Sequence, residues 1–402
     1  MSDPRDTIRA ETLQGSAPAC DLDLVPAGIK RVPSGVDGLA TERLVVNIGP
    51  QHPSTHGVLR LIAELDGEEI VNVETSVGYL HRGIEKLAEH RRYHQLGTLM
   101  DRGDYVSGIH GELAAALAVE ELLEIEVPPK AHWLRSLMGE INRLSSHLVW
   151  YGTFGLDCGA MGQFLYALRE REALLDILEA VTGQRMMFNY VRPGGVLADL
   201  PPEAEQKIRA FLRTIDGYLD EHHALLGGNE IFQKRVRGIG VIDRATALSF
   251  GLTGANLRCA GVPYDVRRDA PYAAYGDLEF DVPLGETGDA WDRYLVRMGE
   301  MRQAVHMMRQ CIDGLPEGDV MGKVPRVLRP PTGEVYARVE SPRGELGVHL
   351  VSDGTDTPYR FHYRAPSLFA MQVLEEILPG HLLADAIVII GSTDVVLGEI
   401  DR

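Results

Sequence analysis

Three consecutive apolar-striped stretches decide the fold: ELAAALAVEELLEI (112–125), AHWLRSLMGEINRLSSHLVWYGTFGLD (131–157) and GQFLYALREREALLDILEAVTG (162–183). All three are rich in strong helix formers, and their apolar residues fall along one helical face. The first stops before Pro128-Pro129, and the third ends at Gly183, as expected of a glycine C-cap. Helices of this kind pack together, so the sequence predicts a helical bundle that starts near His110.

Strand patterns lie on both sides of these helices. Residues 42–49, 58–65 and 68–75 are rich in β-branched and aliphatic residues and include a turn at Asp66-Gly67, which predicts an antiparallel meander. After Pro330-Pro331, residues 334–340, 345–353 and 358–365 predict three further strands with tight turns. The predicted class is α+β, a helical bundle with small antiparallel sheets near both ends.

The chain divides into an arm and one domain. Residues 1–41 are rich in Gly, Pro, Ser and Asp without periodicity, which predicts a flexible or partner-bound arm, with ordered structure from about Glu42. The domain covers 42–402. Its parts are a β meander with polar loops (42–109), the helical bundle (110–313, including two more helices near 202–226 and 288–311) and a C-terminal β/α part (330–402).

Charge and hydropathy exclude several classes of protein. The formal net charge of -18 argues against a nucleic-acid-binding protein, which needs a basic face for phosphates. No stretch approaches the ~20 apolar residues that span a bilayer, and the best candidate, residues 384–390, has only the length of a strand. The N-terminus contains acids and no apolar signal-peptide core. We expect a cytoplasmic protein that reaches a membrane only through a partner.

Motifs for common cofactor and catalytic sites are missing from the sequence. The four cysteines, Cys20, Cys158, Cys259 and Cys311, are far apart and form no CxxC pair. We therefore expect neither a disulfide framework nor an iron–sulfur cluster held by this chain alone. The sequence also lacks a dinucleotide fingerprint, a P-loop and a nucleophile elbow.

The most unusual polar segment is GPQHPSTHG (49–57), which places His52 and His56 in a turn between apolar strands. A loop of this composition can present polar groups to a ligand. The histidine spacing resembles a helical zinc pair, but Pro53 lies between the two residues and disfavours the helix that such a pair needs. The alternative is a structural turn whose histidines hydrogen-bond to the backbone, and spacing alone leaves both readings open.

Three other segments carry candidate residues: GYLHRGIEK (78–86), MDRGDY (100–105) and LDCGAM (156–161). The first could line a polar cavity or form a solvated helix face. Tyr105 fits either a proton donor or a core residue with a bonded hydroxyl. Asp157 interrupts an apolar helical run, so it must be paired, shifted in pKa or catalytic. The structural alternative is an ion pair with Arg169 or Arg143.

Taken together, the motifs resemble a known family. The residues that carry the resemblance include GPQHPSTHGVLRL, GYLHRGIEKLAEHR, MDRGDY, LDCGAM, YVRPGGV, DVPLGETGDAWDRYLVR, RGELG, VSDGTDTPYR and GEIDR. In this order, from about Glu42 to Arg402, they closely resemble the D subunit of bacterial NADH-quinone oxidoreductase, the family of the mitochondrial complex I 49 kDa subunit. That family is similar to the large subunit of nickel-iron hydrogenases, which implies a hydrogenase-like domain over 42–402.

The resemblance implies a quinone site in place of the hydrogenase metal. Two cysteine pairs hold the metal in hydrogenases, whereas the corresponding stretches here read LHRGIEK (80–86) and VVLGEID (395–401), which contain no thiolate ligand. The implied catalytic residues are His56 and Tyr105, which hydrogen-bond the quinone carbonyls, and Asp157, which pairs with His56. His52 belongs to the same implied quinone site.

Arg82 and Arg102 are implied to lie near the terminal iron–sulfur cluster of a partner, where their charge would raise its potential. The chain itself would bind no cofactor, and quinone would be its substrate. Electrons would come from NADH through FMN and iron–sulfur clusters in partner subunits. The implied partners are peripheral-arm subunits B, C, E, F, G and I and the membrane-arm H subunit of a proton-translocating complex, which places the chain peripherally on the cytoplasmic side of the cell membrane.

Two departures from the family pattern keep alternatives open. Met186-Met187-Phe188 stands where the family usually has a histidine near the terminal cluster, and the family's helix before Pro330 is missing. These features suggest a divergent second copy. The alternatives are a related membrane-bound oxidoreductase module with another electron donor, such as ferredoxin, and a scaffold subunit that has lost the quinone site.

Overall fold

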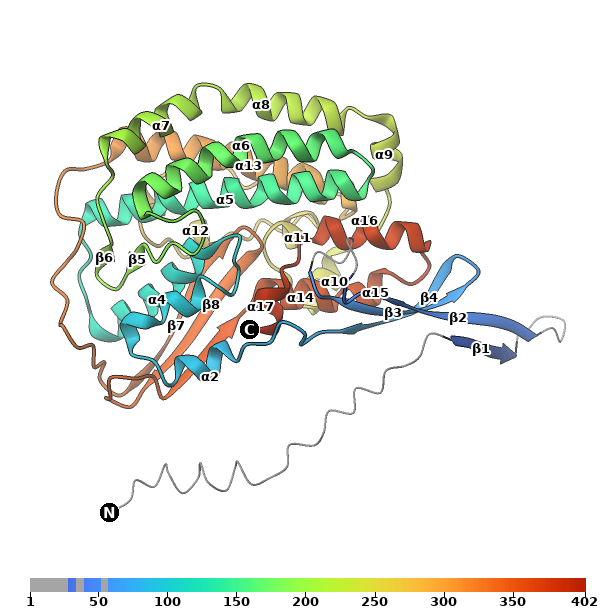
Figure 1. Ribbon diagram of the computed structural model, residues 1–402, viewed down its shortest axis with the longest axis horizontal. Coiled ribbons are helices and arrows are strands. Elements are labelled where there is room, and N and C mark those ends of the chain that lie inside the picture. Colours follow the sequence, from blue (N-terminus) through green and yellow to red (C-terminus); the bar gives the residue numbers. More distant parts are fainter. Residues whose placement is uncertain (1–27, 34–39, 52–56) are drawn as a thin grey trace, which may run out of the picture.

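The computed structural model of the chain describes residues 28–33, 40–51 and 57–402, with side chains from Arg43 onward. Figure 1 shows a layer of long helices along the top, with the four-stranded and the three-stranded antiparallel sheets at opposite ends below it. The C-terminal helices lie between the two sheets. This mixture of helices and small antiparallel sheets confirms the α+β prediction.

The N-terminal sheet is an antiparallel meander with the strand order β1-β2-β3-β4. Its strands are β1 (Gly28–Pro33), β2 (Ala40–Ile48), β3 (Arg60–Asp66) and β4 (Glu69–Ser76). Gly67 takes a left-handed conformation, with φ of 65°, in the predicted turn between β3 and β4. The predicted meander is therefore confirmed.

One described strand precedes Glu42, near which we expect ordered structure to start. Strand β1 lies inside the predicted arm and pairs antiparallel with β2, from Gly28 opposite Val45 to Pro33 opposite Ala40. The pairing supplies partners for backbone groups that β2 would otherwise leave at an open edge. The rest of the predicted arm, 1–27 and 34–39, lies outside the described residues.

The long helices are the predicted ones. They are α4 (Gly108–Leu123), α5 (Pro129–Asp157), α6 (Met161–Thr182), α7 (Pro202–Leu212), α8 (Ile215–His222) and α13 (Ala290–Gly314). Pro129 opens α5 in the first turn, where its missing N–H has no helical partner to lose. Gly183 caps α6 with φ of 76°. Helix α5 packs against α6 and α13 and is buried along most of its length.

The single helix predicted over 202–226 is wrong in detail, because the chain breaks between α7 and α8. The hydroxyl of Thr214 donates a hydrogen bond to the carbonyl of Phe211 (3.2 Å), a local bond that competes with helical pairing. After α8 the chain continues as a π-helical turn, η3 (His223–Gly227).

Shorter elements connect these helices. In the polar loops before the bundle they are α2 (Ile84–Ala88), η2 (Tyr93–Gln95) and α3 (Gly97–Met100). In the stretch between α6 and α13 they are β5 (Val191–Arg192), β6 (Gly195–Val196), α9 (Glu230–Val236), α10 (Arg244–Ser249), α11 (Ala255–Arg258), α12 (Val266–Asp269) and η4 (Tyr275–Asp277).

The C-terminal part begins with the second predicted sheet, of order β7-β8-β9, on which α4 packs. Its elements are β7 (Gly333–Ser341), β8 (Gly344–Ser352), β9 (Arg360–Arg364), α14 (Pro366–Gln372), α15 (Leu374–Ile377), α16 (Leu383–Thr393) and α17 (Leu397–Asp401). The segment 315–332 contains no helix, in line with the departure noted in the sequence.

The apolar run 384–390 has the length of a strand but lies in helix α16, which packs on α5 and α13. Its Val388, Ile389 and Ile390 are buried there, so tertiary packing overrides their preference for strands. None of the helices in the described ranges combines the length and the apolar character needed to span a bilayer.

Candidate functional site

Helix α17 contacts the described end of the GPQHPSTHG loop. His52 and His56 lie outside the described residues, but Gly57, which follows His56 in the sequence, is described. A Cβ placed on Gly57 would lie 3.4 Å from Cγ of Leu397, the first residue of α17. The C-terminal end of the GPQHPSTHG loop therefore rests on α17.

Tyr105 contacts the next residue of the same helix. It lies half-buried in the turn between α3 and α4, and a Cβ on Gly398 would lie 2.9 Å from Cε1 of its ring. Burial raises the pKa of the Tyr105 phenol, and the positive charge of Arg343 opposes this shift. The structure thus brings Tyr105 and the described end of the histidine loop to adjacent residues of α17.

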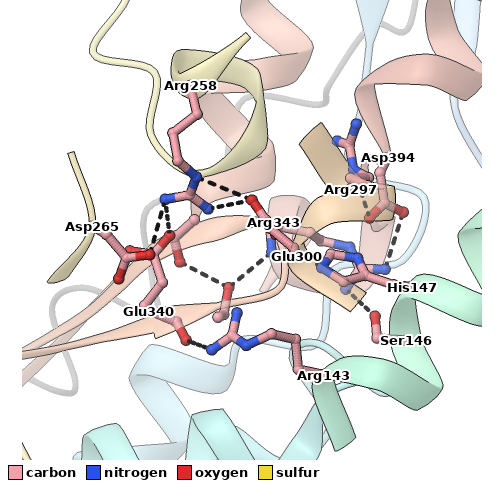
Figure 2. A network of polar contacts seen from close by, with 12 residues as sticks. Arg143, Ser146, His147, Arg258, Asp265, Arg297, Glu300, Glu340, Arg343 and Asp394 are labelled. Carbon is pink, nitrogen blue, oxygen red and sulfur yellow. Dashed lines mark hydrogen bonds and ion pairs between the residues drawn. The ribbon is translucent and has the colours of Figure 1, made fainter. Parts of the chain in front are cut away.

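The buried guanidinium group of Arg343 lies near Tyr105. Figure 2 shows Arg343 with Ser146 and Asp394. Arg343, in the turn between β7 and β8, donates hydrogen bonds to Asp104 Oδ2 (2.7 Å), Ser146 Oγ (3.1 Å) and Asp394 Oδ1 (3.2 Å). Asp104 precedes Tyr105, Ser146 belongs to α5, and Asp394 caps the C-terminus of α16. Arg343 therefore ties together three segments that are distant in the sequence.

Glu399 lies in the same region and is fully buried in α17. Its Oε2 accepts a hydrogen bond from the Tyr363 hydroxyl (3.2 Å), and its Oε1 accepts one from the Ser367 N–H (2.9 Å). Burial, and after it the negative charge of Asp104, raises the pKa of Glu399 to about 7. At neutral pH this carboxyl group can hold or release a proton.

Figure 2 also shows a second group of buried polar side chains near Arg343, which includes His147, Glu300 and Arg258. His147, next to Ser146, contacts Glu300 (2.9 Å), and Glu300 accepts hydrogen bonds from Arg258 (2.7 and 3.0 Å). Arg258 also donates to Glu340 (2.8 Å), which lies on β7. All of these side chains are almost completely buried, so each charge depends on its partners.

Asp157 lies away from the Arg343 cluster. It is the last residue of α5 and is half-buried. At about 1.5 Å per residue it lies roughly 16 Å further along α5 than Ser146 of the Arg343 cluster. The two arginines named as structural partners bind other acids, since Arg143 pairs with Glu140 and Arg169 with Glu170.

Arg82 and Arg102 come together around one buried acid, Asp101. Arg102 donates hydrogen bonds to Asp101 Oδ1 (2.7 Å) and to the Thr98 carbonyl (2.6 Å). Burial raises the pKa of Asp101 to about 6, while the charges of Arg102 and Arg82 act in the opposite direction. Arg82 is exposed and Arg102 is partly exposed, so this pair can present positive charge at the surface.

The C-terminus holds the GYLHRG loop in place. Asp401 accepts hydrogen bonds from the N–H groups of Gly78 (2.8 Å) and Leu80 (2.6 Å), and its carbonyl oxygen lies 2.7 Å from His81 Nδ1. A cavity of about 480 Å³ opens here, and its lining includes His81, Glu85 and Asp401. The segments 80–86 and 395–401 are therefore neighbours in space.

Within the described ranges, no cluster of three or more His, Cys, Asp or Glu side chains is arranged to hold a metal ion. Cys158, Cys259 and Cys311 are free thiols, and Cys20 lies outside the described residues.

Sequence reasoning missed Arg343, Asp394 and Glu399 as neighbours of Tyr105. Their motifs, RGELG (343–347) and GEIDR (398–402), carry part of the resemblance, but no spacing rule connects them to residue 105. One signal was present: Asp394 and Glu399 interrupt an apolar C-terminal segment, and buried carboxylates require partners.

Comparison with known proteins agrees with the motifs. A family model described as "Respiratory-chain NADH dehydrogenase, 49 Kd subunit" matches residues 157–332 and 323–402. The NADH-quinone oxidoreductase D subunit of Bacillus cytotoxicus is 47% identical over 364 residues, which cover 90% of this chain and 100% of the relative. The NADH-quinone oxidoreductase D 2 subunit of Solibacter usitatus is 46% identical, with 90% and 98% covered. The chain therefore belongs to the family of the 49 kDa subunit of respiratory-chain NADH dehydrogenase, which includes the D subunit of NADH-quinone oxidoreductase.

Proposed function

We propose that this chain is the quinone-site subunit of a proton-translocating NADH:quinone oxidoreductase. One observation carries the proposal: Tyr105 and Gly57, the residue after His56, contact the adjacent residues Gly398 and Leu397. This arrangement supports a site in which a phenol and an imidazole face the same ligand.

The proposed chemistry uses both groups as proton donors. Reduction of a quinone to a quinol takes two electrons and two protons. His56 suits the first donor role, because an imidazole is the side chain whose ordinary pKa lies nearest neutrality. Tyr105 suits the second, since a phenol with a raised pKa donates only once negative charge has built up on the quinone oxygen. His52 would line the site, and Asp157 would pair with His56.

A nickel-iron hydrogenase-like arrangement also fits this chain. The stretches 80–86 and 395–401, which correspond to the cysteine pairs of those enzymes, are tied together by Asp401. Histidine, carboxylates and backbone groups stand there without thiolates, and such a set suits an organic ligand better than a nickel-iron centre.

The electron path belongs to the proposal as well. Arg82 and Arg102, whose charges both act on Asp101, would face the terminal iron–sulfur cluster of a partner subunit, where positive charge favours the reduced cluster. FMN and the other clusters would reside in peripheral-arm subunits B, C, E, F, G and I, and quinone would arrive from the side of the membrane-arm H subunit. The chain would lie peripherally on the cytoplasmic face of the cell membrane.

A second candidate function is a related module with a different electron donor. It is favoured by the helix-free segment 315–332 and by Met187, whose φ of 59° puts a non-glycine residue in the left-handed region at the position of the family's usual histidine. A scaffold without quinone chemistry remains the third reading, and the contact between Tyr105 and α17 speaks against it.

The test is NADH-driven quinone reduction by the complex purified through a tag on this chain. Both His56→Ala and Tyr105→Phe should lower the rate at least about tenfold, because each removes a general acid, while assembly is retained. Tyr151→Phe is the matched control, since that hydroxyl donates to the His222 carbonyl inside the bundle. If reduced ferredoxin replaces NADH as the donor, the second function holds. Unchanged rates in both variants would contradict the quinone site.

A further inference from the structure

Three buried carboxylates lie near the Arg343 guanidinium beside Tyr105, and two of them pair with it directly. Arg343 donates to Asp104 and to Asp394, and Glu399 is buried next to them. A second cation, Arg297, approaches Asp394 at 3.9 Å, and its charge is shared with Glu300. Two guanidinium groups therefore face three acids inside the protein, where an uncompensated negative charge is costly. The arrangement favours one proton on the carboxylate group.

Glu399 is the acid best suited to carry that proton. Asp104 and Asp394 are both ion-paired with Arg343. Glu399 is instead bonded to neutral donors, the Tyr363 hydroxyl and the Ser367 N–H. Neutral donors stabilise a carboxylate less than an ion pair does, so protonation costs Glu399 less than it costs the two aspartates.

Glu399 is also connected to Tyr105 through the packing of the turn. Gly398, its neighbour in α17, contacts the Tyr105 ring. The Tyr363 hydroxyl, which donates to Glu399, lies 3.2 Å from the position of a Cβ on Gly103, two residues before Tyr105. Tyr363 therefore lies between the Glu399 carboxyl group and the turn that carries Tyr105.

We propose that Glu399 stores a proton in the resting protein and returns it to Tyr105 after that phenol has protonated the quinone. This inference rests on the proposed function, and Glu399 acts in it as a positioning residue, because it reaches the substrate only through Tyr105.

The step balances in atoms and charge. The partner's cluster supplies the electrons. The Tyr105 O–H bond breaks as an O–H bond forms on the quinone oxygen, which leaves a phenolate. The Glu399 O–H bond then breaks as the Tyr105 O–H bond re-forms, directly or through the Tyr363 hydroxyl. The resulting Glu399 carboxylate lies near Arg343, and a proton from solvent restores the acid before the next turnover.

The pH dependence follows from the groups that face Glu399. They are Asp104 and Tyr105 of the 101–107 turn, Arg343 of the β7–β8 turn, Tyr363 of β9 and Ser367 of α14. Asp394, at the C-cap of α16, shares Arg343 with Asp104. Burial and Asp104 raise the pKa of Glu399 to about 7. The acid is protonated below this value, so proton return slows as the pH rises through about 7.

The test compares quinone reduction by the assembled complex from about pH 6 to about pH 9. Wild type should lose activity with a midpoint near 7. Glu399→Gln keeps the shape of the side chain but removes the acid. Its rate of quinone reduction should be roughly tenfold lower than that of wild type at about pH 6, and the rate should no longer fall as the pH rises through about 7. Glu399→Asp, which keeps a carboxyl group, should restore the decline with a shifted midpoint.

The matched control is Glu170→Gln, which removes another buried carboxylate, paired with Arg169 on α6. It should keep the wild-type pH profile. If the Glu399→Gln complex kept the wild-type rate and pH profile, the role of Glu399 would be overturned. A loss of activity in Tyr105→Phe would then still support the quinone site. If Tyr105→Phe also left the rate unchanged, the proposed function itself would be contradicted. If Glu399→Gln does not assemble, the profile of Glu399→Asp decides: an unshifted midpoint overturns the inference.

Discussion

Among single residues, Gly398 determines where the Tyr105 ring lies. The Tyr105 ring packs directly on its backbone, and a Cβ there would also lie 2.5 Å from the carbonyl oxygen of Gly103. Neither neighbour is the flexible end of a side chain, because one is a ring held in a turn and the other is backbone. A side chain at residue 398 would therefore displace the turn that carries the phenol.

Gly398→Ala should lower quinone reduction roughly tenfold to hundredfold, because a displacement of about 1 Å in a reacting group has effects of that size. Reduction by NADH of the flavin and iron–sulfur clusters proposed for the partner subunits should be unchanged. Gly217→Ala in α8 is the control, since a Cβ there meets nothing within 4 Å. Equal quinone activity in both variants would show that the contact does not position Tyr105.

Which residues could be predicted from the sequence depends on how far apart the partners lie. Tyr105 and Arg102 could be singled out because MDRGDY is a local pattern, and Arg102 indeed binds its neighbour Asp101. The contact from Arg343 to Asp104 joins residues that are 239 positions apart, and no local spacing predicts it. His52 and His56 stay predictions, because they lie outside the described residues.

Among the secondary-structure elements, helix α17 connects three segments that are distant from it in the sequence. Its Asp401 accepts two N–H groups of the GYLHRG loop, and its Leu397 and Gly398 contact Gly57 and Tyr105. A helix of this length is not stable alone, so α17 depends on packing against α14 and its neighbours. The loop and the helix should therefore order each other.

Asp401→Asn should loosen the GYLHRG loop, because a neutral amide is a weaker acceptor for two backbone N–H groups than a carboxylate. The expected cost is about 1–3 kcal/mol of local opening free energy. Hydrogen–deuterium exchange of the assembled complex should show faster exchange at residues 78–83. The exposed Asp277→Asn is the control. Unchanged exchange in Asp401→Asn would mean that other contacts hold the loop.

The elements themselves were predictable where the signal was local. The ends of α5 and α6 follow from Pro129 and Gly183, and the meander follows from its alternation and Gly67. The prediction failed near Thr214, which interrupts the single helix predicted over 202–226 and whose hydroxyl donates to the Phe211 carbonyl. For residues 384–390 the sequence indicated only the length of the apolar run, and the structure places this run in α16, packed against α5.

In the molecule as a whole, buried ion pairs join the helical bundle to the C-terminal sheet. Arg258 of α11 binds Glu300 of α13 and Glu340 of β7, and all three side chains are essentially inaccessible to water. A buried pair of this kind need not add much net stability, but the removal of one partner leaves charge without compensation.

Arg258→Met should therefore cost about 3–5 kcal/mol, because it leaves Glu300 and Glu340 without their shared cation. The yield of assembled complex and its melting temperature should both fall. Arg185→Met, which removes an exposed cluster with Glu172 and Asp176, should leave the melting temperature nearly unchanged, because water screens exposed ion pairs. Equal losses in the two variants would show that the buried network is no more important than a surface one.

Photolabelling of the purified complex with a photoreactive quinone, followed by peptide mapping of this chain, would show where the quinone binds. If the quinone binds between the histidine loop and Tyr105, the label should fall on peptides that contain residues 49–57, Tyr105 or 395–401, and excess unlabelled quinone should prevent it. Labelling of other subunits alone, or labelling here that excess quinone does not reduce, would contradict a quinone site on this chain.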